Sequence, residues 1–151
     1  MTTIFAFMAA DHDRLDGIFQ EFKQLMKTDK DRAHSRFLDF KAGLERHIFW
    51  EEDILFPIFE RETGMRDVGP TAVMRMEHRQ IRGFLQDIGE ELLAEKTEEI
   101  EKAEIGLLEV LGSHNQKEEN ILYPAIDDLT SEQEKERKIE RMTAMPIGNP
   151  A

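Results

Sequence analysis

The amino-acid sequence predicts an all-α protein folded as an antiparallel up-down four-helix bundle, followed by a short fifth helix. Apolar residues recur at steps of three and four along four long segments, which is the period of an amphipathic helix. No alternating run of Val, Ile and Thr bounded by turn residues indicates a strand. The connections between the four segments are short, and short connections place consecutive helices antiparallel.

Start and stop signals bound the helices in chain order. Pro70 suits the first turn of the third helix, Thr97 can cap the fourth, and Ser131 with Glu134 forms a capping box for the fifth. The expected helices span about 3–27, from Asp29 or Asp31 to about 62, 70 to about 95, 97 to about 127, and a short stretch after Ser131.

The chain has 151 residues, which suits one domain. Residues 1–143 are expected to form it, and residues 144–151, with two Pro and one Gly, are expected to form a flexible C-terminal tail. No apolar run reaches the roughly 20 residues of a membrane span. The absence of cysteine excludes disulfides and thiolate metal sites and fits the cytoplasmic location that we predict.

Charge limits the partners of this chain. With 20 basic and 32 acidic residues, its formal net charge is −12. Such a surface repels phosphate groups, so neither nucleic acid nor an anionic membrane is an expected partner. The sequence identifies no protein partner.

Six polar residues interrupt the apolar faces of the four predicted helices. They are His12, His47, Glu51, His78, His114 and Glu118. Burying a carboxylate or a charged imidazole without a partner costs several kcal/mol. Metal ions would offset this cost, because they bind carboxylate oxygen and neutral imidazole nitrogen directly. We therefore predict that these six residues are metal ligands.

An internal repeat divides these residues into two equivalent sets. The motif H-x-x-x-E-E begins at His47 and returns at His114, an offset of 67 residues, while His12 and His78 are 66 residues apart. Residues four apart share a helix face, so each histidine and glutamate of a motif can reach one site. Four histidines and two bridging glutamates would give each of two metals two nitrogens and two shared oxygens, with a bridging oxide or hydroxide from solvent.

These motifs resemble those of the hemerythrin-like, or HHE cation-binding, family. The resemblance extends from His12 to Pro124 and includes both H-x-x-x-E-E motifs and a Gly-Pro pair ahead of His78. It implies a non-haem di-iron centre that reacts with dioxygen, nitric oxide or peroxide. Nitrogen and oxygen donors without sulfur also suit manganese or zinc.

Within that family, the ligand set is closest to the repair-of-iron-centres proteins. Oxygen-carrying hemerythrins have a second histidine one turn away on the third helix, where this chain has Met74 and Arg82. They also have an aspartate five residues after the histidine of the fourth helix, whereas here Glu118 follows His114 by four. Repair proteins usually carry a cysteine-bearing N-terminal segment, and this chain has no cysteine.

Four functions stay open on the sequence alone. The first is a di-iron protein that binds or senses dioxygen or nitric oxide. The second is a di-iron enzyme that consumes peroxide or nitric oxide, although the sequence identifies no catalytic residue. The third is an iron donor or repair protein in oxidative or nitrosative stress, and the fourth is a structural metal site without reactivity.

Four further polar residues are expected to lie outside the site. His34 falls off the apolar face of its helix and should be solvated. Glu52 and Glu119 are interpreted as surface charges, with hydrogen bonding to an imidazole as the alternative. Tyr123, the only tyrosine, follows Glu118 by five residues and should point away from the ligand face and serve in packing.

Overall fold

The computed structural model describes residues 2–147 of the chain. This range contains seven α-helices and two π-helical segments. No strand occurs among these residues, which confirms the predicted all-α class. None of the helices in this range has the length and hydropathy of a membrane span. The elements are α1 (Ile4–Leu25), α2 (Lys30–Phe49), the π-helical η1 (Trp50–Leu55), α3 (Phe56–Thr63), α4 (Pro70–Leu93), α5 (Thr97–Lys117), the π-helical η2 (Glu118–Leu122), α6 (Tyr123–Leu129) and α7 (Glu132–Ala144).

Two of the predicted caps are present, and one is not. Asp29 accepts a hydrogen bond from the backbone N–H of Arg32 at the start of α2, and Ser131 does the same for Glu134 at the start of α7, the predicted fifth helix. Thr97 was expected to cap the fourth helix, but it is the first residue of α5. Lys96 occupies the cap position and makes no side-chain hydrogen bond there.

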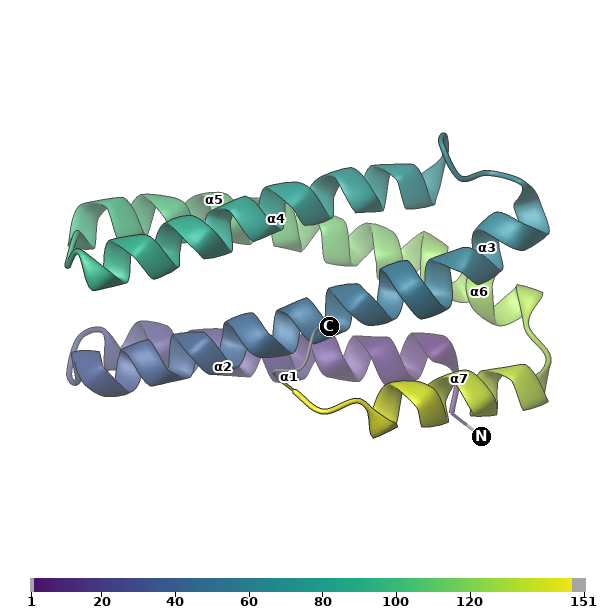
Figure 1. Cartoon of the computed structure of the whole chain (residues 1–151), viewed down its shortest axis with the longest axis horizontal. Helices are drawn as coiled ribbons and strands as arrows, with labels where there is room; N and C mark the ends of the chain where they lie inside the picture. The colour runs from purple at the N-terminus through teal and green to yellow at the C-terminus, as the bar shows by residue number, and fades with distance from the viewer. Residues whose placement is uncertain (1, 148–151) are drawn as a thin grey trace.

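The long helices form two hairpins. α1 packs along α2, and α4 packs along α5. Figure 1 shows the hairpins side by side, with the α1–α2 and α4–α5 connections at the same end of the molecule. Contacts of α1 and α3 with α6, and of α2 and α3 with α4, hold the hairpins together. α7 packs against α1 and η1.

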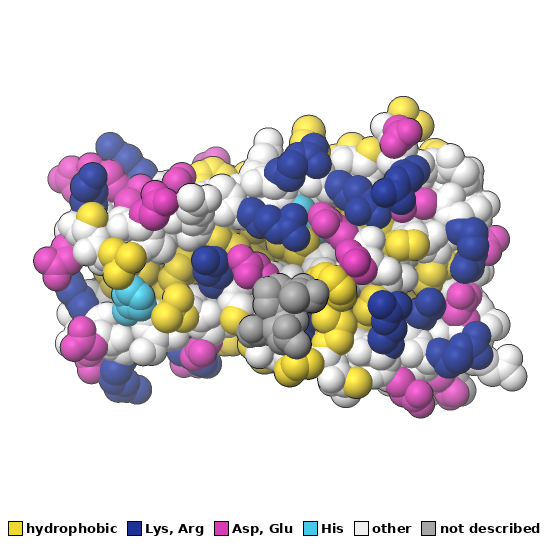
Figure 2. Space-filling model, in the orientation of Figure 1, with side chains coloured by type: hydrophobic (Ala, Val, Ile, Leu, Met, Phe, Trp, Pro, Cys, Tyr) yellow, Lys and Arg dark blue, Asp and Glu magenta, His cyan; other side chains and the backbone are white. Residues whose placement is uncertain are grey.

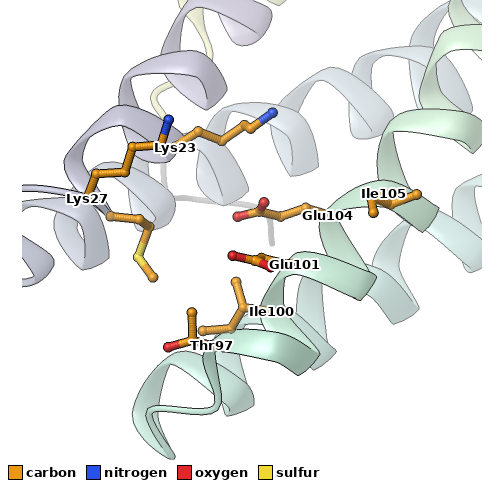
Figure 3. Close-up of a pocket in the computed structure, with 8 residues that line it drawn as sticks. Lys23, Lys27, Thr97, Ile100, Glu101, Glu104 and Ile105 are labelled. Atoms are coloured by element: carbon orange, nitrogen blue, oxygen red, sulfur yellow. The ribbon is translucent and has the colours of Figure 1, made fainter.

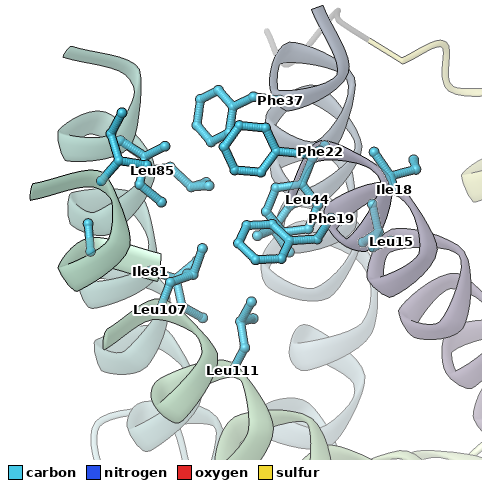
Figure 4. Packing of buried hydrophobic residues seen from close by; sticks show 14 of the residues in the cluster. Leu15, Ile18, Phe19, Phe22, Phe37, Leu44, Ile81, Leu85, Leu107 and Leu111 are labelled. Carbon is cyan, nitrogen blue, oxygen red and sulfur yellow. The ribbon is translucent and has the colours of Figure 1, made fainter. Parts of the chain in front are cut away.

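The buried apolar side chains form two clusters, one on either side of a polar layer. The first fills the end near the two connections, where Figure 4 shows phenylalanines of α1 and α2 facing leucine and isoleucine side chains of α4 and α5. The second joins the start of α1 to η1, α3, η2, α6 and α7. Along each long helical run, the six predicted ligands lie between residues of the two clusters.

The two π-helical segments interrupt the second and fourth helical runs at equivalent places. In each, a backbone N–H bonds to the carbonyl five residues earlier, from Phe56 to Glu51 and from Tyr123 to Glu118. A proline follows directly in both cases. Proline has no N–H and clashes with the carbonyl four residues back, and a wider turn relieves that conflict. The helical runs therefore continue past both prolines.

Charged side chains of both signs are spread over the face of the molecule in Figure 2, with apolar side chains between them. α7 extends to Ala144, the first residue of the predicted flexible tail. Residues 148–151 of that predicted tail lie outside the described residues. The division of the chain at residue 143 therefore stays a prediction.

Candidate metal centre

All six predicted ligands meet in the polar layer between the two apolar clusters. Each is at most 4% exposed to solvent. The side chains come from α1, α2, η1, α4, α5 and η2. The fifth histidine, His34, is half-buried near the start of α2, beside Leu92 at the far end of α4. It does not join the cluster.

His12 and His47 form one end of the cluster. The Nε2 atom of His12 is 3.2 Å from Oε1 of Glu118, and Nε2 of His47 is 3.8 Å from Oε2 of Glu51. The two imidazole centroids are 4.7 Å apart. One oxygen of each glutamate therefore faces this pair of histidines.

His78 and His114 form the other end. The Nε2 atom of His78 is 3.1 Å from Oε1 of Glu51, and Nε2 of His114 is 3.0 Å from Oε2 of Glu118. The centroids of these rings are 4.9 Å apart. Each glutamate thus presents one oxygen to each histidine pair, which is the arrangement that a carboxylate needs to bridge two metal ions.

Glu52 and Glu119 bind the outer nitrogen of two of these imidazoles. Nδ1 of His12 is 2.6 Å from Oε2 of Glu119, and Nδ1 of His78 is 2.6 Å from Oε2 of Glu52. The side chain of Glu119 is 33% exposed, and that of Glu52 is 18% exposed. Their interpretation as surface charges is wrong, because each side chain reaches a histidine of a neighbouring helix.

Asp11 and Glu77 do the same for the other two imidazoles. Nδ1 of His47 is 2.8 Å from Oδ2 of Asp11, and Nδ1 of His114 is 2.9 Å from Oε1 of Glu77. These two acids are not among the residues predicted from the sequence. One signal was available, since each directly precedes the repeat-related histidine of its helix.

The four outer carboxylates orient the imidazoles so that Nε2 of each ring faces inward. In a neutral imidazole whose Nδ1–H donates to a carboxylate, Nε2 keeps a lone pair, which here would face glutamate oxygens. Two acceptors that face each other repel unless a proton or a metal cation lies between them. Oε2 of Glu118 is buried and makes no hydrogen bond with any described residue, even though His114 is close. This donor set fits metal ions.

Protons on the imidazoles can balance the glutamates when no metal is bound. Burial lowers the pKa of His12 and of His78, but contacts with Glu118 and Glu51 respectively outweigh burial and raise each pKa to about 9. For His47, burial dominates and lowers the pKa. Metal binding must therefore displace protons from the centre.

Tyr123 lies within the cluster, contrary to expectation. Its hydroxyl donates to Oε2 of Glu51 at 2.6 Å, is 3.0 Å from Oε1 of Glu118, and is 3.3 Å from Nε2 of both His12 and His47. In a regular α-helix, the fifth residue after Glu118 would be rotated off its face. The π-helical turn of η2 returns it to that face. Burial, followed by the nearby glutamates, raises the pKa of Tyr123 well above its usual value.

Two surface hollows differ in their relation to the cluster. One, of about 450 Å³, lies between the end of α1 and the start of α5, where Figure 3 shows Lys23 and Lys27 near Glu101 and Glu104. It shares no residue with the cluster. The other, of about 350 Å³, lies between α1 and α5 and is lined partly by His12. It is lined by one of the predicted ligands and by Glu119, the carboxylate that contacts that ligand.

Comparison with family models gives one match, to a hemerythrin HHE cation binding domain over residues 3–126. The matched range contains the six clustered histidines and glutamates, their four outer carboxylates and Tyr123. Comparisons with curated proteins and with solved structures found no match.

Proposed function

Because the chain belongs to the hemerythrin HHE cation-binding family, we propose that it is a di-iron protein built as an antiparallel up-down four-helix bundle. The proposed ligands are His12, His47, Glu51, His78, His114 and Glu118. Buried His and Glu groups of this kind suit metal ions. The family favours iron, although the donor atoms would also accept manganese or zinc.

One observation carries the proposal of two ions. The imidazole nitrogens and the glutamate oxygens fall into two groups, one around His12 and His47 and the other around His78 and His114. Glu118 belongs to both groups, and Glu51 has an oxygen near a histidine of each. A single metal ion would fill only one of these groups and leave the other to be neutralised by protons on its imidazoles.

We propose that the centre binds or senses dioxygen or nitric oxide. The near-complete burial of the ligands favours small diatomic molecules over larger substrates. The bound ions would supply redox and Lewis-acid chemistry. The chain itself orients the imidazoles through the outer carboxylates and excludes bulk water.

A second candidate is an enzyme that consumes peroxide or nitric oxide. The hydroxyl of Tyr123 favours it if that hydroxyl keeps its proton when metal is bound, because a buried O–H inside the donor set can deliver a proton to a bound small molecule. An iron donor in oxidative or nitrosative stress is the third candidate, and it predicts loosely held iron.

The test begins with metal content. The protein is purified from iron-replete cells, and metals per chain are measured together with optical spectra of the oxidised and reduced forms. Two irons per chain with oxo-bridge absorption are expected. Less than one metal per chain, or zinc alone without that absorption, would contradict the di-iron proposal.

Reaction with small molecules then separates the candidates. A stable, reversible adduct of the reduced protein with dioxygen or nitric oxide supports binding or sensing. Repeated turnover of peroxide or nitric oxide with the metal retained supports the enzyme. Rapid transfer of iron to a competing chelator under mild conditions supports the iron donor.

A further inference from the structure

The sequence repeat is visible in the contacts of the site. The Nδ1–carboxylate contacts in the two halves measure 2.6 and 2.6 Å for one related pair and 2.8 and 2.9 Å for the other. The inner contacts of His12 with Glu118 and of His78 with Glu51 measure 3.2 and 3.1 Å. The two halves are therefore nearly equivalent around the six ligands.

One pair of repeat-related residues breaks this equivalence. Tyr123 corresponds to Phe56 at the same offset of 67 residues. The ring of Tyr123 lies 5.8 Å from the ring of His12, and the ring of Phe56 lies 5.8 Å from that of His78, the related histidine. The two aromatic rings hold corresponding places, and they differ chemically by one hydroxyl group.

That hydroxyl has the spacing of a ligand atom. Its four neighbours, at 2.6, 3.0, 3.3 and 3.3 Å, are oxygens of Glu51 and Glu118 and the Nε2 atoms of His12 and His47. Around a six-coordinate ion with bonds of about 2.1 Å, adjacent ligand atoms are about 3.0 Å apart. The distances from the Tyr123 hydroxyl to these four atoms, 2.6 to 3.3 Å, are therefore close to the distance between two ligand atoms of one ion.

The glutamate contacts change only beside this hydroxyl. Nε2 of His114 is 3.0 Å from its glutamate oxygen, whereas the related distance from His47 to Glu51 is 3.8 Å. Oε2 of Glu51, the atom in the longer contact, is the one that accepts the hydrogen bond from Tyr123. The hydroxyl therefore contacts donor atoms only at the His12 and His47 end of the cluster, among the described residues.

We propose that Tyr123 is an additional ligand of the metal ion held by His12 and His47, which makes the two metal positions inequivalent. The inference rests on the proposed di-metal centre. On metal binding, the phenolic O–H bond breaks, an oxygen–metal bond forms and the proton leaves to solvent. The position beside His78 and His114 has Phe56 in the related place and keeps a coordination site free for a small molecule.

The competing interpretation is that Tyr123 only donates a hydrogen bond to Glu51 from outside the coordination shell. Resonance Raman and visible spectra of the oxidised, iron-loaded full chain distinguish the two. Direct ligation predicts a phenolate-to-iron(III) charge-transfer band and tyrosinate ring modes that shift when tyrosine is deuterated. Because the chain has one tyrosine, these modes can be assigned without variants.

The outcomes separate this inference from the proposed function. Two irons per chain with oxo-bridge absorption but no tyrosinate modes would overturn the ligand role and leave the di-iron proposal standing. A chain that binds no iron would overturn both. Two irons together with tyrosinate modes would support both.

Two variants test the inequivalence. Tyr123→Phe should keep two irons and lose the charge-transfer band, and a retained band would overturn the proposal. The double variant Tyr123→Phe/Phe56→Tyr moves the hydroxyl to the related place and should restore the tyrosinate modes. A doubly substituted chain with two irons and no such modes would contradict the equivalence of the two places.

The free coordination site has its own test. In the single variant Phe56→Tyr, the added hydroxyl is expected to occupy that site. Binding of nitric oxide to the reduced, iron-loaded protein should then be lost or strongly weakened, with the iron content unchanged. Wild-type affinity in this variant would overturn the assignment of the free site to the His78 and His114 position.

Discussion

The histidines of this protein differ by their surroundings rather than by their chemistry. His47 and His114 each have a carboxylate on Nδ1 and a glutamate oxygen near Nε2, inside a buried polar layer. His34 has neither contact and is half-buried near the start of α2, away from the cluster. The histidines of the site are therefore distinguished by the carboxylate at Nδ1 and the glutamate oxygen near Nε2.

Replacing a histidine of the cluster should lower metal content and stability together. His47→Ala or His114→Ala removes a proposed ligand and leaves a buried carboxylate without its imidazole partner, which costs about 1–3 kcal/mol or more. His34→Ala should change neither quantity by much. Elemental analysis and thermal unfolding by circular dichroism measure both effects, and equal losses in all three variants would refute the assignment.

The outer carboxylates should tune metal affinity without binding the metal. Glu119→Gln or Glu52→Gln preserves shape but removes the charge that orients and polarises an imidazole. Loss of such a partner typically weakens metal binding about 10–100-fold. Competition with a coloured chelator measures the affinity. The exposed Glu136→Gln on α7 is the matched control, and an equal effect there would point to net charge rather than to hydrogen bonding.

At the scale of helices, the two π-helical turns set which residues reach the site. An uninterrupted α-helix through η2 would place Ile121 toward the core, yet Ile121 is exposed and Leu122 and Tyr123 are buried. The wide turn shifts the register by one residue after Glu118. The proline that follows favours this turn, so a local backbone constraint decides the composition of the metal site.

α1 packs closely against α2 at Gly43, and this contact predicts the effect of a larger side chain there. A Cβ atom at Gly43 would lie 2.8 Å from Cδ2 of the buried Leu15. Overpacking costs about 1–3 kcal/mol, and the helix preference for Ala over Gly offsets about 0.5–1 kcal/mol of it. Gly43→Ala should therefore lower the free energy of unfolding by about 1 kcal/mol, as measured by urea denaturation.

Gly17 on α1 supplies the control for that substitution. A Cβ atom there meets no other atom within 4 Å. Gly17→Ala should raise the free energy of unfolding by about 0.5–1 kcal/mol, through helix preference alone. Destabilisation of similar size at both positions would show that steric contact with Leu15 is not the cause.

Considered as a whole, the molecule carries a layer of buried polar groups between two apolar clusters. This layer connects all four long helical runs, so whatever neutralises it contributes to the stability of the entire fold. A ligand that binds only the folded state stabilises it by mass action, by about 2.7 kcal/mol when its free concentration is 100 times its dissociation constant.

Removal of the metal should therefore lower the melting temperature of the whole chain in one transition. The reduced protein is treated with a chelator, dialysed and melted, and a reloaded sample serves as the control. Recovery of the original melting temperature on reloading is expected. An unchanged melting temperature in the metal-free protein would show that the polar layer is satisfied without a cation.

The helical class and the six histidines and glutamates of the candidate cluster can be predicted from the sequence. Both follow from local rules, because helix period, caps such as Asp29 and Ser131, and polar interruptions of an apolar face depend on residues close in the chain. The repeat offset alone relates His12 to His78. The six proposed ligands therefore follow from the sequence.

The groups that surround that cluster depend on how the helices pack and cannot be predicted from the sequence pattern. Asp11 and Glu77 bind imidazoles on neighbouring helices, and Glu52 and Glu119 reach across between helices in the same way. Such pairings depend on how two helices face each other, which no pattern within one helix encodes. Tyr123 was misplaced for a related reason, since its direction is set by a π-helical turn that the α-helical period does not contain.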